Sequence, residues 1–126
     1  MKRISALIVD DSSVMRKIVE RCLRQAGIEF SGVIEAGNGK EALDLLQTNT
    51  VDLILSDINM PIMNGLEFVE ALTANPAIKN VPVVMITTEA SESSVLRALS
   101  YGARGYIRKP FTPDEVKEHV LPLLSQ

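Results

Sequence analysis

The segment VDLILSDINMP at residues 51–61 contains an apolar run that stops at a carboxylate, Asp57. Leu53, Ile54 and Leu55 are apolar without alternation, which is typical of a strand buried on both faces of a parallel sheet. Asp57 is therefore expected where this strand leaves the core. An aspartate that caps the next helix or forms a turn would fit the same position, so this stretch alone leaves both interpretations open.

Three other strand-like runs, at residues 6–9, 83–86 and 105–108, also stop at polar side chains. The residues that follow them are two acids, two hydroxyls and one amine: Asp10, Asp11, Thr87, Thr88 and Lys109. Ligands of open α/β sheets bind outside the carboxyl ends of the strands. We therefore expect these side chains to converge at one edge of the sheet.

Strand-like and helix-like segments alternate along the chain. The predicted strands lie at about residues 4–10, 31–35, 53–55, 81–87 and 105–108, and the second is short and weak, as suits an outer position. Helical spacing of apolar residues marks the segments between them and the C-terminal segment. The pattern predicts an α/β fold with a doubly wound, five-stranded parallel sheet and right-handed crossovers. With no linker, low-complexity tract or duplication in sight, we expect a single domain over residues 1–126.

The composition argues against several classes of function. The chain has 126 residues, of which 46% are hydrophobic and 23% charged, as expected for one folded domain with a core. A net charge of -3 argues against a nucleic-acid binder. No apolar run approaches the roughly 18 residues of a membrane span, and no leader segment is visible. We therefore expect a cytoplasmic protein without a membrane anchor, and a monomer.

Some residues have ordinary structural interpretations. Cys22 falls on the apolar side of a predicted helix at about residues 14–26 and is interpreted as a core thiol. Arg16 and Lys17 lie on the other side of that helix, which we interpret as a solvated face. The single histidine, His119, is expected to be solvated or to lie at an interface, and it cannot form a histidine cluster for zinc.

Asp10, Asp11 and Asp57 would repel one another if no cation or shared proton relieved them. Mg²⁺ is usually bound by one or two carboxylates with water and phosphate oxygens, so the three acids indicate Mg²⁺ and phosphate chemistry. An ionised aspartate can attack phosphorus to give an acyl phosphate. Lys109 could then neutralise charge on the transferring group, and the Thr87 hydroxyl could donate to it. A cluster of acids neutralised by Lys109 alone is the alternative.

Taken in order, these motifs resemble the receiver domains of two-component response regulators, and most of all the single-domain chemotaxis regulators of the CheY type. The resemblance covers essentially the whole chain. It implies a flavodoxin-like (βα)5 domain with strand order 2-1-3-4-5 and no output domain. The residues that carry it are Val9-Asp10-Asp11, Asp57 with Met60-Pro61 and Asn64-Gly65, Ile86-Thr87, and Lys109-Pro110-Phe111.

The resemblance implies that a histidine kinase donates a phosphoryl group to Asp57. It implies further that Mg²⁺ is the cofactor and is bound by Asp10, Asp11 and Asp57 with the backbone carbonyl of Asn59. Thr87 and Lys109 would contact the phosphoryl group. The protein would then be a phosphoacceptor switch and not a conventional enzyme.

Other positions acquire conformational or kinetic roles from the same resemblance. Tyr106 would change its position as Thr87 is drawn inward, and the Lys109-Pro110 bond would be cis. Asn59 and Glu89 occupy the positions that tune how long the phosphate lasts. Thr88 stands where the family usually has a smaller residue, which would narrow access to the phosphoryl group.

The output would be a protein contact, through the surface formed by the helix near residues 89–101, the strand at 105–108 and the last helix. The flagellar motor switch is the partner that a chemotaxis regulator implies. A phosphorelay intermediate and a stand-alone regulator of another pathway remain alternatives. A phosphoaspartate phosphatase is less favoured, because phosphatases of the haloacid dehalogenase type usually have an aspartate where this chain has Asn59. A flavin or nucleotide carrier is disfavoured because the first loop is Asp-Asp-Ser-Ser.

Overall fold

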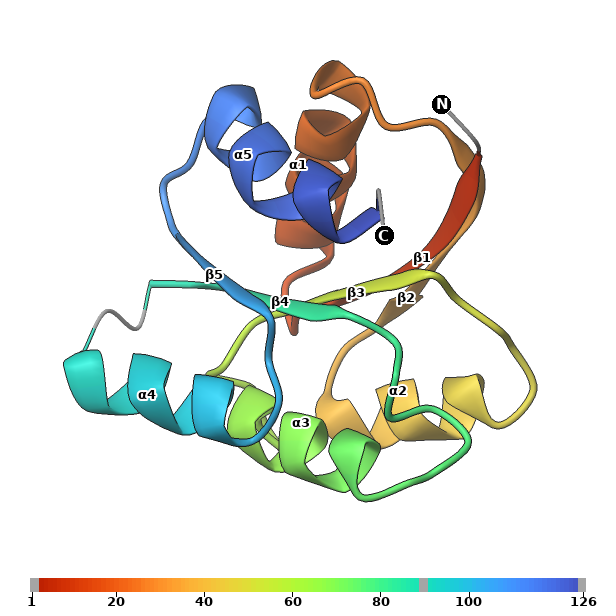
Figure 1. Cartoon of the computed structure of the whole chain (residues 1–126), viewed down its shortest axis with the longest axis vertical. Helices are drawn as coiled ribbons and strands as arrows, with labels where there is room; N and C mark the ends of the chain where they lie inside the picture. Colours follow the sequence, from red (N-terminus) through yellow and green to blue (C-terminus); the bar gives the residue numbers. More distant parts are fainter. Residues whose placement is uncertain (1–2, 89–90, 125–126) are drawn as a thin grey trace.

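The computed structural model describes residues 3–88 and 91–124 of the chain. A five-stranded parallel sheet lies in the middle, with strand order β2-β1-β3-β4-β5 (Figure 1). The strands are β1 (Ile4–Val9), β2 (Phe30–Ala36), β3 (Leu53–Ser56), β4 (Val83–Thr87) and β5 (Gly105–Arg108). The helices are α1 (Ser13–Gln25), α2 (Gly39–Leu46), α3 (Gly65–Thr73), α4 (Glu92–Ser100) and α5 (Pro113–Leu124). This arrangement confirms the predicted doubly wound α/β fold and its strand order.

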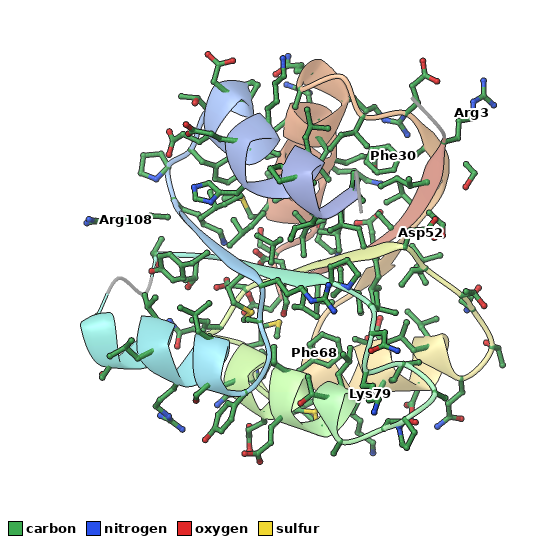
Figure 2. The ribbon with its side chains drawn as sticks, in the orientation of Figure 1. Arg3, Phe30, Asp52, Phe68, Lys79 and Arg108 are labelled. Atoms are coloured by element: carbon green, nitrogen blue, oxygen red, sulfur yellow. The ribbon has the colours of Figure 1, made fainter. Side chains whose placement is uncertain are left out.

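The sheet is covered on both faces. Helices α1 and α5 lie on one face, and α2, α3 and α4 lie on the other (Figure 1). Each face has its own hydrophobic cluster, and Phe68 of α3 lies between its helix and the sheet (Figure 2). All four residues of the central strand β3 are buried, as the unbroken apolar run predicted. Two apolar layers therefore fix the sheet, so that its polar strand ends lie along one edge.

Side-chain caps stabilise the N-termini of the helices that border this edge. The hydroxyl of Ser12 accepts a hydrogen bond from the backbone N–H of Met15 and caps α1. Asn64 and Glu67 form a reciprocal capping box at the start of α3. Since α1 follows β1 and α3 follows β3, these caps also fix how the chain turns away from the two strand ends.

Several predicted details need correction. β2 is longer than the predicted 31–35, because it pairs with β1 along nearly its whole length, from Ile4 opposite Phe30 to Val9 opposite Ala36. Its outer position in the sheet is confirmed. Strand β4 begins at Val83, after Pro82, and not at about residue 81.

Burial also departs from the simplest amphipathic pattern. Val14 of α1 is 68% exposed and Leu96 of α4 is 57% exposed, although both are apolar. Cys22 is half-buried and packs against the core, and burial raises the pKa of its thiol. His119 is exposed, as expected. Within the described parts of the chain, no helix has both the length and the apolarity needed to cross a membrane.

Candidate functional site

The acidic residues predicted to converge do meet at the carboxyl edge of the sheet. Val9 of β1 lies opposite Ser56 of β3, and the backbone N–H of Asp57 donates to the carbonyl of Val9 over 2.9 Å. This register places the residues that follow the two strands side by side. One carboxylate oxygen from each of Asp10, Asp11 and Asp57 lies within 4.8 Å of the others.

Lys109, on the segment after β5, supplies a cation to this cluster. Its Nζ atom lies 2.9 Å from Oδ2 of Asp10 and 3.2 Å from Oδ2 of Asp57. Burial acts to lower the pKa of Lys109, but the hydrogen bond to Asp10 and the charges of both carboxylates outweigh it and raise that pKa above its ordinary value. Lys109 is therefore a fixed positive charge at physiological pH. The Lys109-Pro110 peptide bond is cis, as the resemblance implied.

The three carboxylates differ in their surroundings. Asp10 is buried, Asp57 is half-buried and Asp11 is exposed. Oδ1 of Asp10 accepts from the backbone N–H of Ser12, and Oδ1 of Asp57 accepts from the backbone N–H of Ile58. The cluster is thus anchored at Asp10 and opens to solvent at Asp11. Three oxygen donors of this kind, with one ammonium group against them, fit the preference of Mg²⁺ for carboxylate and water ligands.

Thr87 and Tyr106 lie on neighbouring strands close to the same edge. Thr87 ends β4 and is fully buried, and its carbonyl accepts from the backbone N–H of Lys109 over 2.9 Å. Tyr106 of β5 is half-buried and pairs with Met85, two positions before Thr87. Each of the two makes further interactions within the chain. The backbone therefore links Thr87 directly to Lys109.

The structure describes two of the three residues expected to tune the phosphate lifetime. Asn59 and Thr88 are both exposed. Glu89 lies outside the residues that the structure describes. Thr88 directly follows the buried Thr87, and its branched side chain is open to solvent.

Gly65 explains why the loop after β3 can turn back beneath Asp57. A side chain at this position would collide with the backbone carbonyl of Asp57 and with the Cα atom of Ile58, neither of which can move away freely. The backbone N–H of Gly65 donates to the carbonyl of Ile58 over 2.7 Å. The Asn64-Gly65 motif thus combines a helix cap with a close backbone approach that only glycine permits.

The same loop contains a backbone conformation that the sequence did not indicate. Ile62 has a φ of 68°, in the left-handed region that a β-branched residue rarely adopts. The N–H of Met63 donates to the carbonyl of Pro61 over 2.7 Å and closes a three-residue turn around Ile62. The Ile62 side chain is 79% exposed, so burial of its apolar surface does not offset the strain.

Sequence reasoning also missed a link between Arg16 and the acids. Arg16 was interpreted as part of a solvated face, but its side chain is only 18% exposed. Its Nη1 atom donates to the backbone carbonyl of Asp10 over 2.5 Å, and its Nε atom donates to Glu35 of β2 over 2.8 Å. Lys17 donates to the same carboxylate over 2.7 Å. The interpretation of Arg16 was therefore wrong, because pairing with Glu35 depends on a strand register that the sequence does not display.

Known proteins have similar sequences and a similar architecture. The family model of the response regulator receiver domain matches residues 6–121. A CheY homologue of Campylobacter jejuni, described as a chemotaxis protein, is 44% identical over 94% of this chain and 91% of its own length. The chemotaxis protein CheY1 of Helicobacter pylori is 44% identical over 94% of this chain and 95% of its own.

Solved structures agree with the sequence comparison. The chemotaxis response regulator CheY4 of Vibrio cholerae superposes with a TM-score of 0.83 at 37% identity, over 97% of this chain and 99% of the other. A CheY-like receiver domain protein of Methanospirillum hungatei gives a TM-score of 0.84 at 28% identity, over 98% of this chain and 95% of the other. The chain therefore belongs to the family of response regulator receiver domains.

Proposed function

We propose that this protein is a two-component response regulator of the chemotaxis type, and that Asp57 accepts a phosphoryl group from a histidine kinase. The observation that carries the proposal is the meeting of Asp10, Asp11 and Asp57 with Lys109 at the carboxyl edge of the sheet. This edge is where open α/β sheets bind their ligands. The similarity to named chemotaxis proteins supports the choice of pathway.

Mg²⁺ is the proposed cofactor. Asp10, Asp11 and Asp57 would bind it together with the backbone carbonyl of Asn59. When bound, Mg²⁺ supplies positive charge against the carboxylates and the incoming phosphoryl oxygens. Asp10 is suited to anchor the ion because Ser12 and Lys109 already fix both of its carboxylate oxygens.

In the proposed reaction, an oxygen of the ionised Asp57 carboxylate attacks the phosphorus atom of a phosphohistidine. A P–O bond forms as the P–N bond breaks, and the imidazole nitrogen of the kinase leaves with the electron pair. The ammonium group of Lys109 and the hydroxyl of Thr87 donate hydrogen bonds to the phosphoryl oxygens. No separate base is required, since the nucleophile is already ionised. Later attack by water on phosphorus releases inorganic phosphate and restores the carboxylate.

The acyl phosphate would act by shifting a conformational equilibrium. A phosphoryl group on Asp57 that accepts a hydrogen bond from the Thr87 hydroxyl favours the state in which that hydroxyl faces Asp57, and Tyr106 on the adjacent strand then adopts a different position. The surface formed by α4, β5 and α5 would differ between the two states. A protein that binds this surface only after phosphorylation is the proposed partner, with the flagellar motor switch as the leading candidate. A cytoplasmic monomer that diffuses between kinase and partner fits this role.

Asn59, Thr88 and Glu89 are proposed to set how long the phosphate lasts. The first two are exposed. Side chains beside the phosphoryl group would admit or exclude the attacking water. Hydrolysis ends the signal and leaves Asp57 free for a second phosphorylation. The duration of the output therefore depends on the lifetime of the phosphoryl group. In this sense it is a phosphoacceptor and not a catalyst of turnover on free substrates.

The proposal is tested by incubation with radiolabelled phosphoramidate, with and without Mg²⁺. We expect Mg²⁺-dependent labelling that reaches a plateau near one phosphoryl group per chain and that is lost in Asp57→Asn. Asp52→Asn is a matched control, because Asp52 lies at the other end of the same strand (Figure 2). Labelling that persists in Asp57→Asn, or steady release of phosphate from phosphomonoesters, would contradict the proposal.

A further inference from the structure

We infer that Arg16 is a positioning residue for the magnesium site: together with Glu35, it fixes the backbone of Asp10 so that the Asp10 carboxylate faces Asp57. The inference rests on the proposed function, since it assigns a role toward the Mg²⁺ that this function requires. Arg16 lies on α1, outside the acidic cluster, and it donates to Glu35 and to the backbone carbonyl of Asp10.

Arg16 completes the set of hydrogen bonds around Asp10. The N–H of Asp10 donates to the carbonyl of Ala36 over 3.0 Å, and its carboxylate is held by Ser12 and Lys109. The carbonyl of Asp10 lies where β1 ends, and it accepts from Nη1 of Arg16. All polar groups of Asp10 are thus bonded. Loss of the guanidinium group would release the carbonyl and allow this peptide unit to rotate.

Arg16 is itself held in one geometry. Glu35 accepts from its Nε atom, and Glu35 lies on β2 opposite Ile8 of β1. A guanidinium group has a planar set of donors, so one group can bond a carboxylate on one strand and a carbonyl at the end of the next. Both side chains of this pair are largely shielded from water, with 18% and 24% exposure. The position of Asp10 is therefore coupled to the outer strand of the sheet.

The neighbouring lysine pairs with the same carboxylate in a more exposed environment. Lys17 also bonds Glu35, but its side chain is 67% exposed, and its bond contributes to the α1–β2 contact and not to Asp10. If these charges served only to attach α1 to β2, the two cations would be equivalent. Only Arg16 reaches the backbone of an acidic site residue. Substitutions at the two positions therefore separate positioning from general stability.

The test is isothermal titration of Mg²⁺ into the wild type, Arg16→Lys, Arg16→Gln and Lys17→Met at equal ionic strength. Residues that orient metal ligands typically change metal affinity by 10–100-fold, so we expect the dissociation constant to rise roughly tenfold in Arg16→Lys. Arg16→Gln should also bind Mg²⁺ more weakly, although removal of a positive charge would by itself strengthen cation binding. Lys17→Met should stay within about twofold of the wild type.

Phosphoramidate labelling gives a second readout that a merely structural role would not change. In Arg16→Lys, the Mg²⁺ concentration for half-maximal labelling rate should rise by roughly the same factor, whereas the rate at saturating Mg²⁺ should approach that of the wild type. Thermal unfolding of each variant shows that the titrations are made on folded protein. Arg16→Gln provides the answer if Arg16→Lys folds poorly.

The outcomes distinguish this inference from the proposed function. A wild type that neither binds Mg²⁺ nor becomes labelled overturns the proposed function, and the inference with it. A wild type that does both, with Arg16 variants that bind Mg²⁺ equally well, overturns the inference alone. Equal weakening in Lys17→Met and Arg16→Lys also overturns it, because the effect would then arise from the α1–β2 contact.

Discussion

The ammonium nitrogen of Lys109 lies 2.9 Å from Oδ2 of Asp10, although 99 positions separate the two residues in the chain. The same nitrogen lies 3.2 Å from Oδ2 of Asp57, and Asp11 adds a further carboxylate to the group. One cation therefore faces three acids. The cluster keeps an excess of negative charge, and we expect both its stability and its affinity for a divalent ion to depend on this imbalance.

Lys109→Met should destabilise the metal-free protein and increase the stabilisation by Mg²⁺. Removal of one partner from a buried ion pair leaves uncompensated charge, so we expect a loss of about 3 kcal/mol in the free energy of unfolding. Mg²⁺ should raise the free energy of unfolding by more in the variant than in the wild type. A ligand that binds only the folded state stabilises that state, and the cluster of the variant has more uncompensated negative charge. Urea denaturation with and without Mg²⁺ measures both quantities.

Lys117→Met is the control for this substitution, since Lys117 is an exposed lysine on α5. Its free energy of unfolding should change by less than about 0.5 kcal/mol. An equal loss in the two variants would show that the ion pairs of Lys109 contribute little. Mg²⁺ that stabilises the wild type and Lys109→Met to the same extent would contradict the predicted charge imbalance.

Glu35 should make stability depend on pH in the acidic range. The hydrogen bond from Lys17 lowers the pKa of Glu35 below its ordinary value of 4.5, with a further contribution from Arg16, although burial acts in the opposite direction. A carboxyl group whose pKa is depressed by folding binds its proton more readily in the unfolded state. Its contribution is therefore fully present above pH 4.5 and is lost as the pH falls through the folded-state pKa.

The measurement compares the wild type with Glu35→Gln by urea denaturation across this range. At neutral pH the variant should be less stable by about 1 kcal/mol, as expected for a partly buried ion pair. That difference should shrink as the pH falls below 4.5. Glu118→Gln, at an exposed position of α5, should show no such convergence. A difference that grows toward acid would mean that the sign of the linkage is wrong.

Gly65→Ala should damage the site through the backbone. The added Cβ atom would collide with the carbonyl of Asp57, so either the loop or the strand end has to move. Overpacking of this kind typically costs 1–3 kcal/mol, and we expect about 2 kcal/mol here together with slower phosphoramidate labelling. Gly32→Ala on β2 is the matched control, because a Cβ atom there meets nothing within 4 Å. If both variants are equally stable and equally labelled, the close backbone approach at Gly65 affects neither stability nor phosphorylation.

The convergence of the acids could be predicted from the sequence for a simple reason. All strands of a parallel sheet run in one direction, so the residues that follow them lie at the same edge whatever the detailed packing. Asp10, Asp57 and Lys109 needed only strand ends that were approximately correct. The register of Val9 with Ser56 then determined which acids lie side by side.

The features that escaped prediction depend on information that is not local. The Arg16–Glu35 ion pair depends on how α1 is placed relative to β2. The sequence alone does not show which charged residues of separate elements will pair. The length of β2 was underestimated by one residue at each end, because pairing with β1 extends the strand from Phe30 to Ala36. The exposure of Val14 was missed because helical spacing marks a stripe without showing where the covering elements end.

Ile62→Asn should stabilise the protein. Isoleucine at φ 68° suffers a clash of its Cβ atom with the backbone, and asparagine tolerates the left-handed region better. The Ile62 side chain is 79% exposed, so the substitution sacrifices little buried apolar surface. We expect a gain of about 1 kcal/mol in the free energy of unfolding. Ile18→Asn on α1, another exposed isoleucine with an ordinary helical backbone, should instead be destabilising. If the two substitutions have the same sign, then relief of backbone strain is not what governs stability at position 62.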